Sequence, residues 1–304
     1  HKTASAPIAI TKGKGALLWD ENGKEFIDAI ASWWVNPYGH SNKYIAEAIY
    51  KQLTTLEHVL FGGFTHEPAV VLAEKLMAIL PKNQQKLFFS DNGSTAVEVA
   101  IKVALQYFFN KGEKKTTIIA FENAFHGDTF AAMAASGISF YTLAFQSMMI
   151  DVVRIPVPVV GQEKASFDAL AKAIKEHNCA GFIYEPLVQG AAGMVMYEAA
   201  ALDTLIRMCK DNNVLTIADE VMTGFGKTGK TFATDYFWAQ LSFKNSTNYD
   251  TGEEFILFNQ YQNENNGTTA SSGIITNTII LPAGVNYSSF TGNGWNFISS
   301  TPQL

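Results

Sequence analysis

Short apolar runs alternate with helical patterns between Lys86 and Asp219, and this alternation constrains the fold more than any other feature of the sequence. Runs rich in β-branched residues, as at 117–121 and 214–218, are typical of strands buried on both faces. The segments between such runs carry apolar residues at helical spacing, as at 167–177. The sequence therefore predicts an α/β fold with a largely parallel central sheet flanked by helices.

The apolar run at 214–218 ends in two carboxylates, Asp219 and Glu220. Open α/β sheets bind ligands at the carboxyl ends of their strands, so Asp219 lies where a ligand is expected. A carboxylate is costly to bury unless it meets a positive partner, and a protonated pyridine nitrogen is such a partner. The alternative is that Asp219 caps the next element or pairs with a nearby lysine.

A second candidate site lies where a predicted helix follows the short strand at 86–89. Thr95 with Glu98 three residues later matches a capping box, which places Gly93 and Ser94 at the helix N-terminus. Free backbone N–H groups and the helix dipole suit a phosphate there, and a glycine lets the backbone approach closely. The alternative is a well-capped helix without a ligand.

Two further loops at predicted strand ends carry candidate side chains. Phe125 and His126 follow the strand at 117–121, where an aromatic ring beside a histidine can stack on a flat cofactor. A lone histidine is usually structural, and spacing alone does not identify His126 as a base. Glu185 ends the strand at 180–184, and Gln189 lies in the glycine-containing loop after it.

Two adjacent tryptophans, Trp33 and Trp34, lie in a loop-like stretch near the N-terminus. The stretch follows a predicted hairpin at 16–28, whose Asn22-Gly23 pair is a signal for a type I′ turn. Core packing is one explanation of the two indoles. The other is a wall for a substrate with an apolar body.

Composition excludes several classes of protein. The chain has 304 residues, of which 47% are hydrophobic, as expected of one large or two ordinary globular domains. A net charge of −6 gives no reason to expect nucleic acid or a membrane surface as partner, and no apolar run approaches a membrane span. Cys179 and Cys209 form no metal-type spacing, so we expect no metal, and a reducing cytoplasm is the default location.

Taken in order, these pieces resemble the class III aminotransferases, which are fold-type I enzymes dependent on pyridoxal 5′-phosphate. The resemblance covers about residues 11–236. The motifs that carry it are Asp91-Asn92-Gly93-Ser94, Phe125-His126-Gly127-Asp128-Thr129, Glu185-Pro186, Ala218-Asp219-Glu220 and the glycine-rich loop at 222–229. Relatives are dimers, so the resemblance implies a homodimer.

The resemblance also implies how the cofactor is held. Gly93 and Ser94 would bind its phosphate, and Asp219 would pair with the pyridinium nitrogen and keep it protonated. Phe125 and His126 would lie beside the ring. Phe125 stands where the family usually has tyrosine, so stacking is kept and a hydroxyl is lost.

For the substrate, the resemblance implies that Trp33 and Trp34 line the pocket together with Phe125, while Glu185 and Gln189 support the cofactor. Ser32-Trp33-Trp34 and the segment 58–66 resemble the branch of the family that acts in biotin synthesis. The implied reaction moves an amino group from S-adenosylmethionine to 8-amino-7-oxononanoate. Another class III ω-amino acid aminotransferase is an alternative, because residues near Trp33 and Phe125 set substrate choice.

Residues 237–304 depart from the family pattern, being rich in Asn, Thr, Ser and Gly with β-prone runs at 274–281 and 294–298. We expect three segments: an N-terminal one at 1–85, a partial cofactor-binding domain at 86–236, and this tail. The Schiff-base lysine of the family is not found, because Lys227, Lys230 and Lys244 do not match its motif. A non-catalytic, truncated or chimeric relative with a β-rich interaction tail is therefore the second hypothesis.

Overall fold

The computed structural model describes residues 6–81, 84–137 and 142–232, and five short strands in the remaining tail. Contacts divide the chain into two compact units, His1–Val59 with Gln260–Ile275 and Leu60–Asn259 with Thr276–Leu304. The three-segment division at 85 and 236 remains a prediction.

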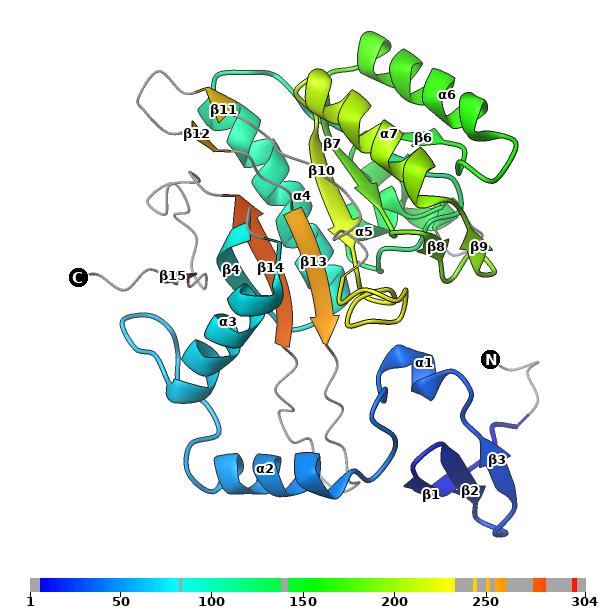
Figure 1. Ribbon diagram of the computed structural model, residues 1–304, viewed down its shortest axis with the longest axis vertical. Coiled ribbons are helices and arrows are strands. Elements are labelled where there is room, and N and C mark those ends of the chain that lie inside the picture. The colour runs from blue at the N-terminus through cyan, green and yellow to red at the C-terminus, as the bar shows by residue number, and fades with distance from the viewer. Residues whose placement is uncertain are drawn as a thin grey trace. The chain divides into compact units, whose positions relative to one another are not determined.

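The first unit contains a three-stranded antiparallel sheet and two short helical segments (Figure 1). Its elements are β1 (Ile10–Lys14), β2 (Leu17–Asp20), β3 (Glu25–Ile27), α1 (Ala31–Trp34) and α2 (Lys43–Leu53). Strands β2 and β3 form the predicted hairpin, but the type I′ turn is wrong, because only Gly23 in the loop has a positive φ. The Asp20 carboxylate fixes the loop instead by accepting bonds from the N–H groups of Asn22 and Lys24 at 2.9 and 2.8 Å.

Segment α1 is not an ordinary helix. Its residues Ala31, Ser32, Trp33 and Trp34 have φ values of 48, 48, 65 and 67°, which makes the segment a left-handed turn. Left-handed backbone costs an L-residue roughly 1–2 kcal/mol, so four in a row need strong local contacts to hold them. The sequence predicted a loop-like stretch for the two tryptophans, and neither the short helical turn nor its left-handedness was predicted.

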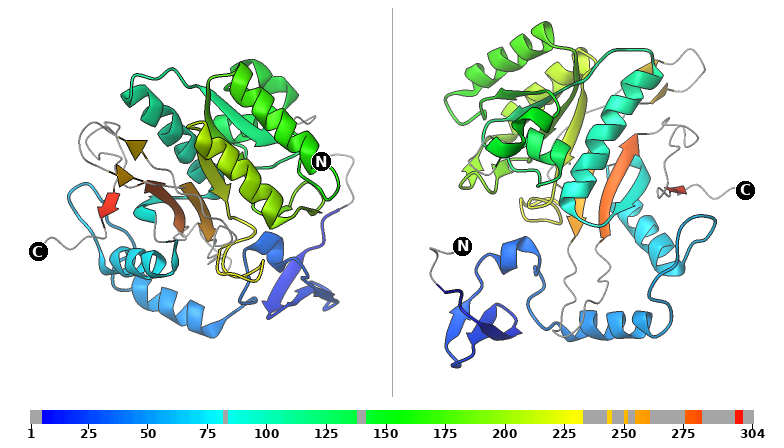
Figure 2. Two further views of the ribbon diagram at one scale, coloured as in Figure 1. Left: turned by 45° about the horizontal axis from the view of Figure 1, so that its top comes forward. Right: turned by 180° about the vertical axis from the view of Figure 1, so that it is seen from behind.

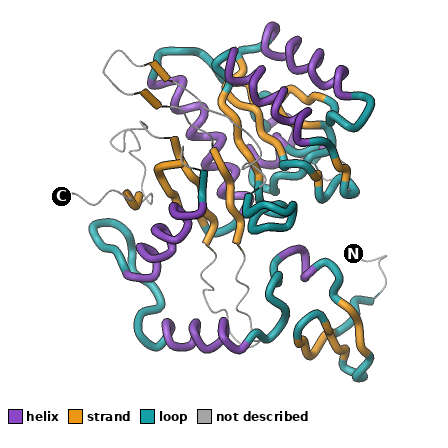
Figure 3. The backbone as a smooth tube through the Cα atoms, viewed as in Figure 1, coloured by secondary structure: helices purple, strands orange, loops and turns teal. Residues whose placement is uncertain are grey.

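The second unit is built on an eight-stranded sheet in the order β15-β4-β14-β13-β10-β7-β5-β6. Figure 3 shows strands in orange and helices in purple. Strand β10 pairs in parallel with β7 and β13, and β5 pairs in parallel with β6 and β7. Strands β14 and β15 pair antiparallel with β4. The largely parallel sheet is therefore confirmed, and the β-prone runs predicted in the tail contribute β14 and β15 to it.

The elements of the second unit follow the predicted alternation closely in its central part. They are α3 (Glu67–Ile79), β4 (Gln84–Ser90), α4 (Gly93–Asn110), β5 (Thr117–Phe121), α5 (Phe130–Ala135), η1 (Leu143–Met148), β6 (Val152–Ile155), α6 (Glu163–Glu176), β7 (Cys179–Tyr184), β8 (Val188–Gln189), β9 (Val195–Met196), α7 (Ala199–Asp211), β10 (Leu215–Asp219), β11 (Phe243–Lys244), β12 (Asp250–Thr251), β13 (Phe255–Gln260), β14 (Thr276–Pro282) and β15 (Phe297–Ser299). Strand β13, helix α5 and the small β8–β9 hairpin were not predicted. None of the described helices combines the length and apolar content that crossing a bilayer requires.

Helices cover both faces of the parallel strands. Ile118 and Ala120 of β5 belong to one core cluster with α4 and α5, whereas Ile119 and Phe121 belong to a second cluster with α6 and α7. This alternation follows from the two-residue period of a strand. Helix α4 lies across the near face of the sheet in the right-hand view of Figure 2, and α7 lies across the near face in Figure 1.

The start of α4 differs from the predicted capping box of Thr95 with Glu98. The N-cap is Asn92, whose side chain accepts from the Thr95 N–H at 3.0 Å, and Thr95 completes the box by bonding the Asn92 N–H. Glu98 instead reaches the next helix, where its Oε2 accepts from the backbone N–H of Ala131 and Ala132 at 2.9 and 3.2 Å. A glutamate of α4 thus caps the N-terminus of α5, where a negative charge is stabilising.

Replacing Glu98 with alanine is expected to lower the free energy of unfolding by about 2–3 kcal/mol, because the first N–H groups of α5 lose their acceptor. Urea denaturation of both proteins measures this difference. Glu74→Ala, at an exposed position of α3, is the matched control and should change stability by less than about 0.5 kcal/mol. Equal effects of the two substitutions would contradict the capping role.

Candidate active site

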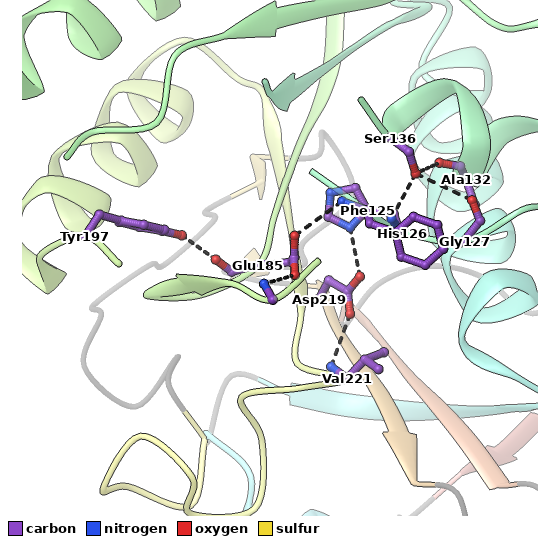
Figure 4. A network of polar contacts seen from close by, with 10 residues as sticks. Phe125, His126, Gly127, Ala132, Ser136, Glu185, Tyr197, Asp219 and Val221 are labelled. Carbon is purple, nitrogen blue, oxygen red and sulfur yellow. Dashed lines mark hydrogen bonds and ion pairs between the residues drawn. The ribbon is translucent and has the colours of Figure 1, made fainter. Parts of the chain in front are cut away.

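Three neighbouring strands of the sheet deliver polar side chains to one edge (Figure 4). Asp219 is the last residue of β10, Glu185 directly follows β7, and the loop that carries Phe125 and His126 follows β5. Because β5, β7 and β10 are parallel neighbours, their carboxyl ends meet. The edge is therefore the place where an open α/β sheet binds its ligand.

Asp219 and His126 form a buried pair at this edge. Nδ1 of His126 lies 2.8 Å from Oδ2 of Asp219, and the two side chains are only 0% and 4% exposed. The other carboxylate oxygen accepts the N–H of Val221 at 3.1 Å. With its proton on Nδ1, His126 donates to Asp219 and fixes the plane of the carboxylate. Each carboxylate oxygen keeps a further lone pair for another donor.

Glu185 is a second buried carboxyl at the same edge. Its Oε1 accepts the N–H of Gly190 at 2.9 Å, and its Oε2 accepts the N–H of Phe125 at 3.4 Å. Burial raises the pKa of Glu185 to about 7. His126 lowers this pKa, the nearby Asp219 raises it, and the two backbone donors lower it. The hydroxyl of Tyr197 donates to the backbone carbonyl of Glu185, as Figure 4 shows.

The loop after β5 joins this edge to the N-terminus of α4. At its far end, the Thr129 N–H donates to Oγ of Ser94 at 2.8 Å. Gly127 has a φ of +127°, and a Cβ there would lie 2.4 Å from Oγ of Ser94, so only glycine allows this approach. His126 and Thr129 are three residues apart and so at most about 10 Å between Cα atoms. The loop therefore connects the Asp219–His126 pair to Ser94 at the start of α4.

The other predicted site residues differ in exposure and in the contacts that they make. Phe125 is 44% exposed, so its ring is available to a ligand. Gln189 is buried in β8 and donates to the carbonyl of Glu122 at 3.3 Å. Gly93 is the first residue of α4, directly before Ser94. Trp33 and Trp34 belong to the first unit, with Trp33 63% exposed.

These features fit a flat cationic ring that carries a phosphate. The buried carboxylate of Asp219 has acceptor capacity left for a protonated ring nitrogen. The N-terminus of α4, where Gly93 is the first residue, offers backbone N–H groups to a phosphate. Within the described residues, Nε2 of His126 is buried without a hydrogen-bond partner. A buried polar atom of this kind is common beside a binding site.

Contacts that involve backbone N–H groups at the site were not predicted from the sequence. Ser136 accepts the N–H of His126 at 2.9 Å, and Gly190 and Val221 donate N–H groups to the two carboxylates. No side-chain pattern announces such contacts. Gly127 was visible as a glycine beside the histidine, but its contact with Ser94 joins segments more than 30 residues apart.

Comparisons with known proteins converge on one family. The model of the family "Aminotransferase class-III" matches residues 1–241. A curated adenosylmethionine-8-amino-7-oxononanoate aminotransferase of Synechococcus elongatus is 47% identical over 76% of this chain and 57% of its own length. Its namesake from Staphylococcus aureus is 39% identical over 75% of this chain and 54% of its own length. This chain thus spans little more than half the length of these relatives.

A solved structure agrees with the sequence relatives. The enzyme of the same name from Methanocaldococcus jannaschii superposes with a TM-score of 0.77 at 30% sequence identity. The superposition covers 95% of this chain and 62% of that chain.

The raised pKa of Glu185 predicts how Glu185→Gln changes the pH dependence of stability. A carboxyl with a raised pKa in the folded state stabilises the fold while protonated, and this contribution is lost as the pH rises from 4.5 to about 7. Glutamine keeps the shape and does not titrate. The stability of the variant relative to wild type should therefore rise by about 3 kcal/mol across this window.

Urea denaturation at several pH values measures this difference. Glu176→Gln, near the exposed end of α6, is the control and should show no such trend. A difference between Glu185→Gln and wild type that stays constant from pH 4.5 to pH 7 contradicts the assignment.

Proposed function

The chain belongs to the class III aminotransferases, and we propose that it is the cofactor-binding part of a transaminase of biotin synthesis. The assigned reaction transfers an amino group from S-adenosylmethionine to 8-amino-7-oxononanoate and gives 7,8-diaminononanoate. The names of the relatives support these substrates. The observation that carries the proposal is the loop that links the Asp219–His126 pair to Ser94 at the start of α4.

The family depends on pyridoxal 5′-phosphate, and the fold is that of the fold-type I enzymes. Asp219 is proposed to hold the protonated ring nitrogen, while Gly93 and Ser94 hold the phosphate. When bound, the cofactor supplies an electron-withdrawing ring that stabilises negative charge on the amino-bearing carbon of a substrate. His126 keeps Asp219 oriented toward the ring by donating from Nδ1.

Phe125 and Glu185 act together in this proposal. Glu185 accepts the N–H of Phe125 and the N–H of Gly190, so it sets the spacing of the two loops beside the ring. The exposed ring of Phe125 offers a stacking surface without a hydroxyl. Gln189 supports the same loops through the carbonyl of Glu122. Trp33 and Trp34 are proposed to meet the apolar body of the substrate.

Proton transfer in a transaminase needs a lysine, and the chain offers Lys227, Lys230 and Lys244 after Asp219. None of them matches the family motif, and the side chain of Lys244 lies outside the described residues. This favours a second function, a ligand-binding relative without turnover. An ω-amino acid aminotransferase is a further alternative, which an assay with S-adenosylmethionine against β-alanine as donor separates from the first.

We also propose that the protein is a homodimer and that it is cytoplasmic. A homodimer agrees with the large apolar side chains exposed on α2, where Tyr44 and Tyr50 are 83% and 72% exposed. A cytoplasmic location agrees with Cys179 and Cys209, which are both buried and free.

Titration with pyridoxal 5′-phosphate, followed by absorbance, tests cofactor binding. Asp219→Asn should weaken binding about 10-fold to 100-fold, because the ring nitrogen loses a charged partner. Asp168→Asn changes a carboxylate that is 66% exposed on α6 and should leave the affinity unchanged. Pyridoxal, which lacks the phosphate, should bind wild type more weakly than the phosphorylated form.

Two results would contradict the proposed site. One is equal affinity of wild type and Asp219→Asn for the cofactor. The other is equal affinity of wild type for pyridoxal and its phosphate, since the N-terminus of α4 would then contribute nothing.

A further inference from the structure

The left-handed turn Ala31–Trp34 is held by one carboxylate, that of Asp28. Oδ1 of Asp28 accepts the backbone N–H of Ser32 at 2.8 Å, and Oδ2 accepts the hydroxyl of Ser32 at 2.7 Å. Nε2 of His40 lies 2.7 Å from the same Oδ2. The Asp28 side chain thus accepts two hydrogen bonds from Ser32, the second residue of the turn, and contacts His40 at the end of the loop.

The base of this loop is anchored in the sheet of the first unit. The N–H of Asp28 donates to the carbonyl of Ala16 at 2.8 Å, directly beyond the β2–β3 pairing. His40 exchanges two backbone bonds with Gly15, at 3.0 and 2.8 Å. Both ends of the segment 28–40 are therefore fixed, and the Asp28–His40 contact joins them.

Apolar packing does not explain the turn. None of the residues of α1 is buried, and Trp33 is 63% exposed. The Asp28 carboxylate is only 6% exposed and the His40 side chain 17%. The side chains of Asp28 and His40 are thus largely shielded from solvent while the indole of Trp33 is exposed, which is the reverse of the usual arrangement. The stabilisation of the turn must therefore come from polar contacts, since burial of apolar side chains does not provide it.

The turn also has hydrogen bonds of its own. The N–H of Trp34 donates to the carbonyl of Ile30 at 2.8 Å, and the N–H of Asn36 donates to the carbonyl of Ala31 at 2.9 Å. The two indoles lie edge to face with ring centroids 6.0 Å apart. The backbone of the turn therefore sets the arrangement of both rings.

The electrostatics agree with a clamp that is charged at neutral pH. Burial alone would raise the pKa of Asp28, but the hydrogen bonds from Ser32 and the contact with His40 lower it below its ordinary value. The carboxylate is ionised at neutral pH, where it accepts all three contacts.

We propose that Asp28, Ser32 and His40 are positioning residues that clamp the left-handed turn and thereby hold Trp33 and Trp34 in place for an apolar ligand. Strained backbone of this kind concentrates at binding sites, where the surrounding structure determines it. The identity of the ligand rests on the proposed function. The clamp itself does not.

Hydrogen exchange of the whole chain, followed by mass spectrometry, tests the clamp without cofactor or substrate. Asp28→Asn removes an acceptor oxygen, and Ser32→Ala removes the hydroxyl. Exchange of the N–H groups of Trp34 and Asn36 should accelerate about tenfold or more in Asp28→Asn and less in Ser32→Ala. Peptides of the β2–β3 hairpin should keep their wild-type rates.

Ser41→Ala is the matched control. Ser41 also has a positive φ, of 56°, and its hydroxyl donates to the carbonyl of Gly13 at 2.8 Å, but it does not touch Asp28. This variant should leave exchange at Trp34 and Asn36 unchanged. Adding Ala31→Gly to Asp28→Asn should slow exchange again, because glycine adopts positive φ without the cost of a side chain.

Three outcomes overturn the clamp: wild-type exchange of the turn in Asp28→Asn, equal acceleration in Ser41→Ala, or equal acceleration of the hairpin and the turn. The last would mean that Asp28 supports the whole unit.

A separate titration with 8-amino-7-oxononanoate should show weaker binding to Asp28→Asn than to Ser41→Ala. If wild type does not bind this compound, the proposed function fails while the exchange result still decides the clamp.

Discussion

The buried contact between Asp219 and His126 is the interaction on which the rest of the structure depends. A carboxylate at the tip of a central strand loses water and must recover its solvation from protein donors. His126 and the N–H of Val221 supply two donors and leave acceptor capacity at the edge of the sheet. The protonated ring nitrogen of the cofactor is the donor that we propose for this remaining capacity. The same loop that brings His126 to Asp219 ends on Ser94, so the residues proposed to hold the ring nitrogen and the phosphate are joined by one loop.

Glu185 shows how two carboxyls share one sheet edge. Two ionised carboxylates close together in a buried site repel, and burial penalises both. Burial raises the pKa of Glu185 to about 7, which leaves this carboxyl largely protonated below neutral pH. Its hydrogen bonds go to Phe125 and Gly190, so its role is to hold loops. Different environments thus separate the tasks of two similar side chains.

Those strands and helices that depend on local apolar periodicity could be predicted from the sequence. Strands β5, β7 and β10 and helices α4, α6 and α7 follow from apolar spacing, and Asp219 follows from its place at a strand end. Contacts between distant segments were beyond reach, as with Glu98 capping α5 instead of its own helix. The left-handed turn was also missed, because the Asp28 carboxylate that holds it makes no periodic pattern. Both features depend on hydrogen bonds between residues that no local sequence pattern connects.

The most direct measurement is nitrogen NMR of the protein loaded with pyridoxal 5′-phosphate labelled with ¹⁵N in the ring. We expect the ring nitrogen to give the resonance of a protonated pyridinium in wild type at neutral pH. In Asp219→Asn it should move to the position of the neutral ring, since the charged partner is gone. A resonance that is neutral in wild type, or identical in the two proteins, contradicts the pairing of Asp219 with the cofactor.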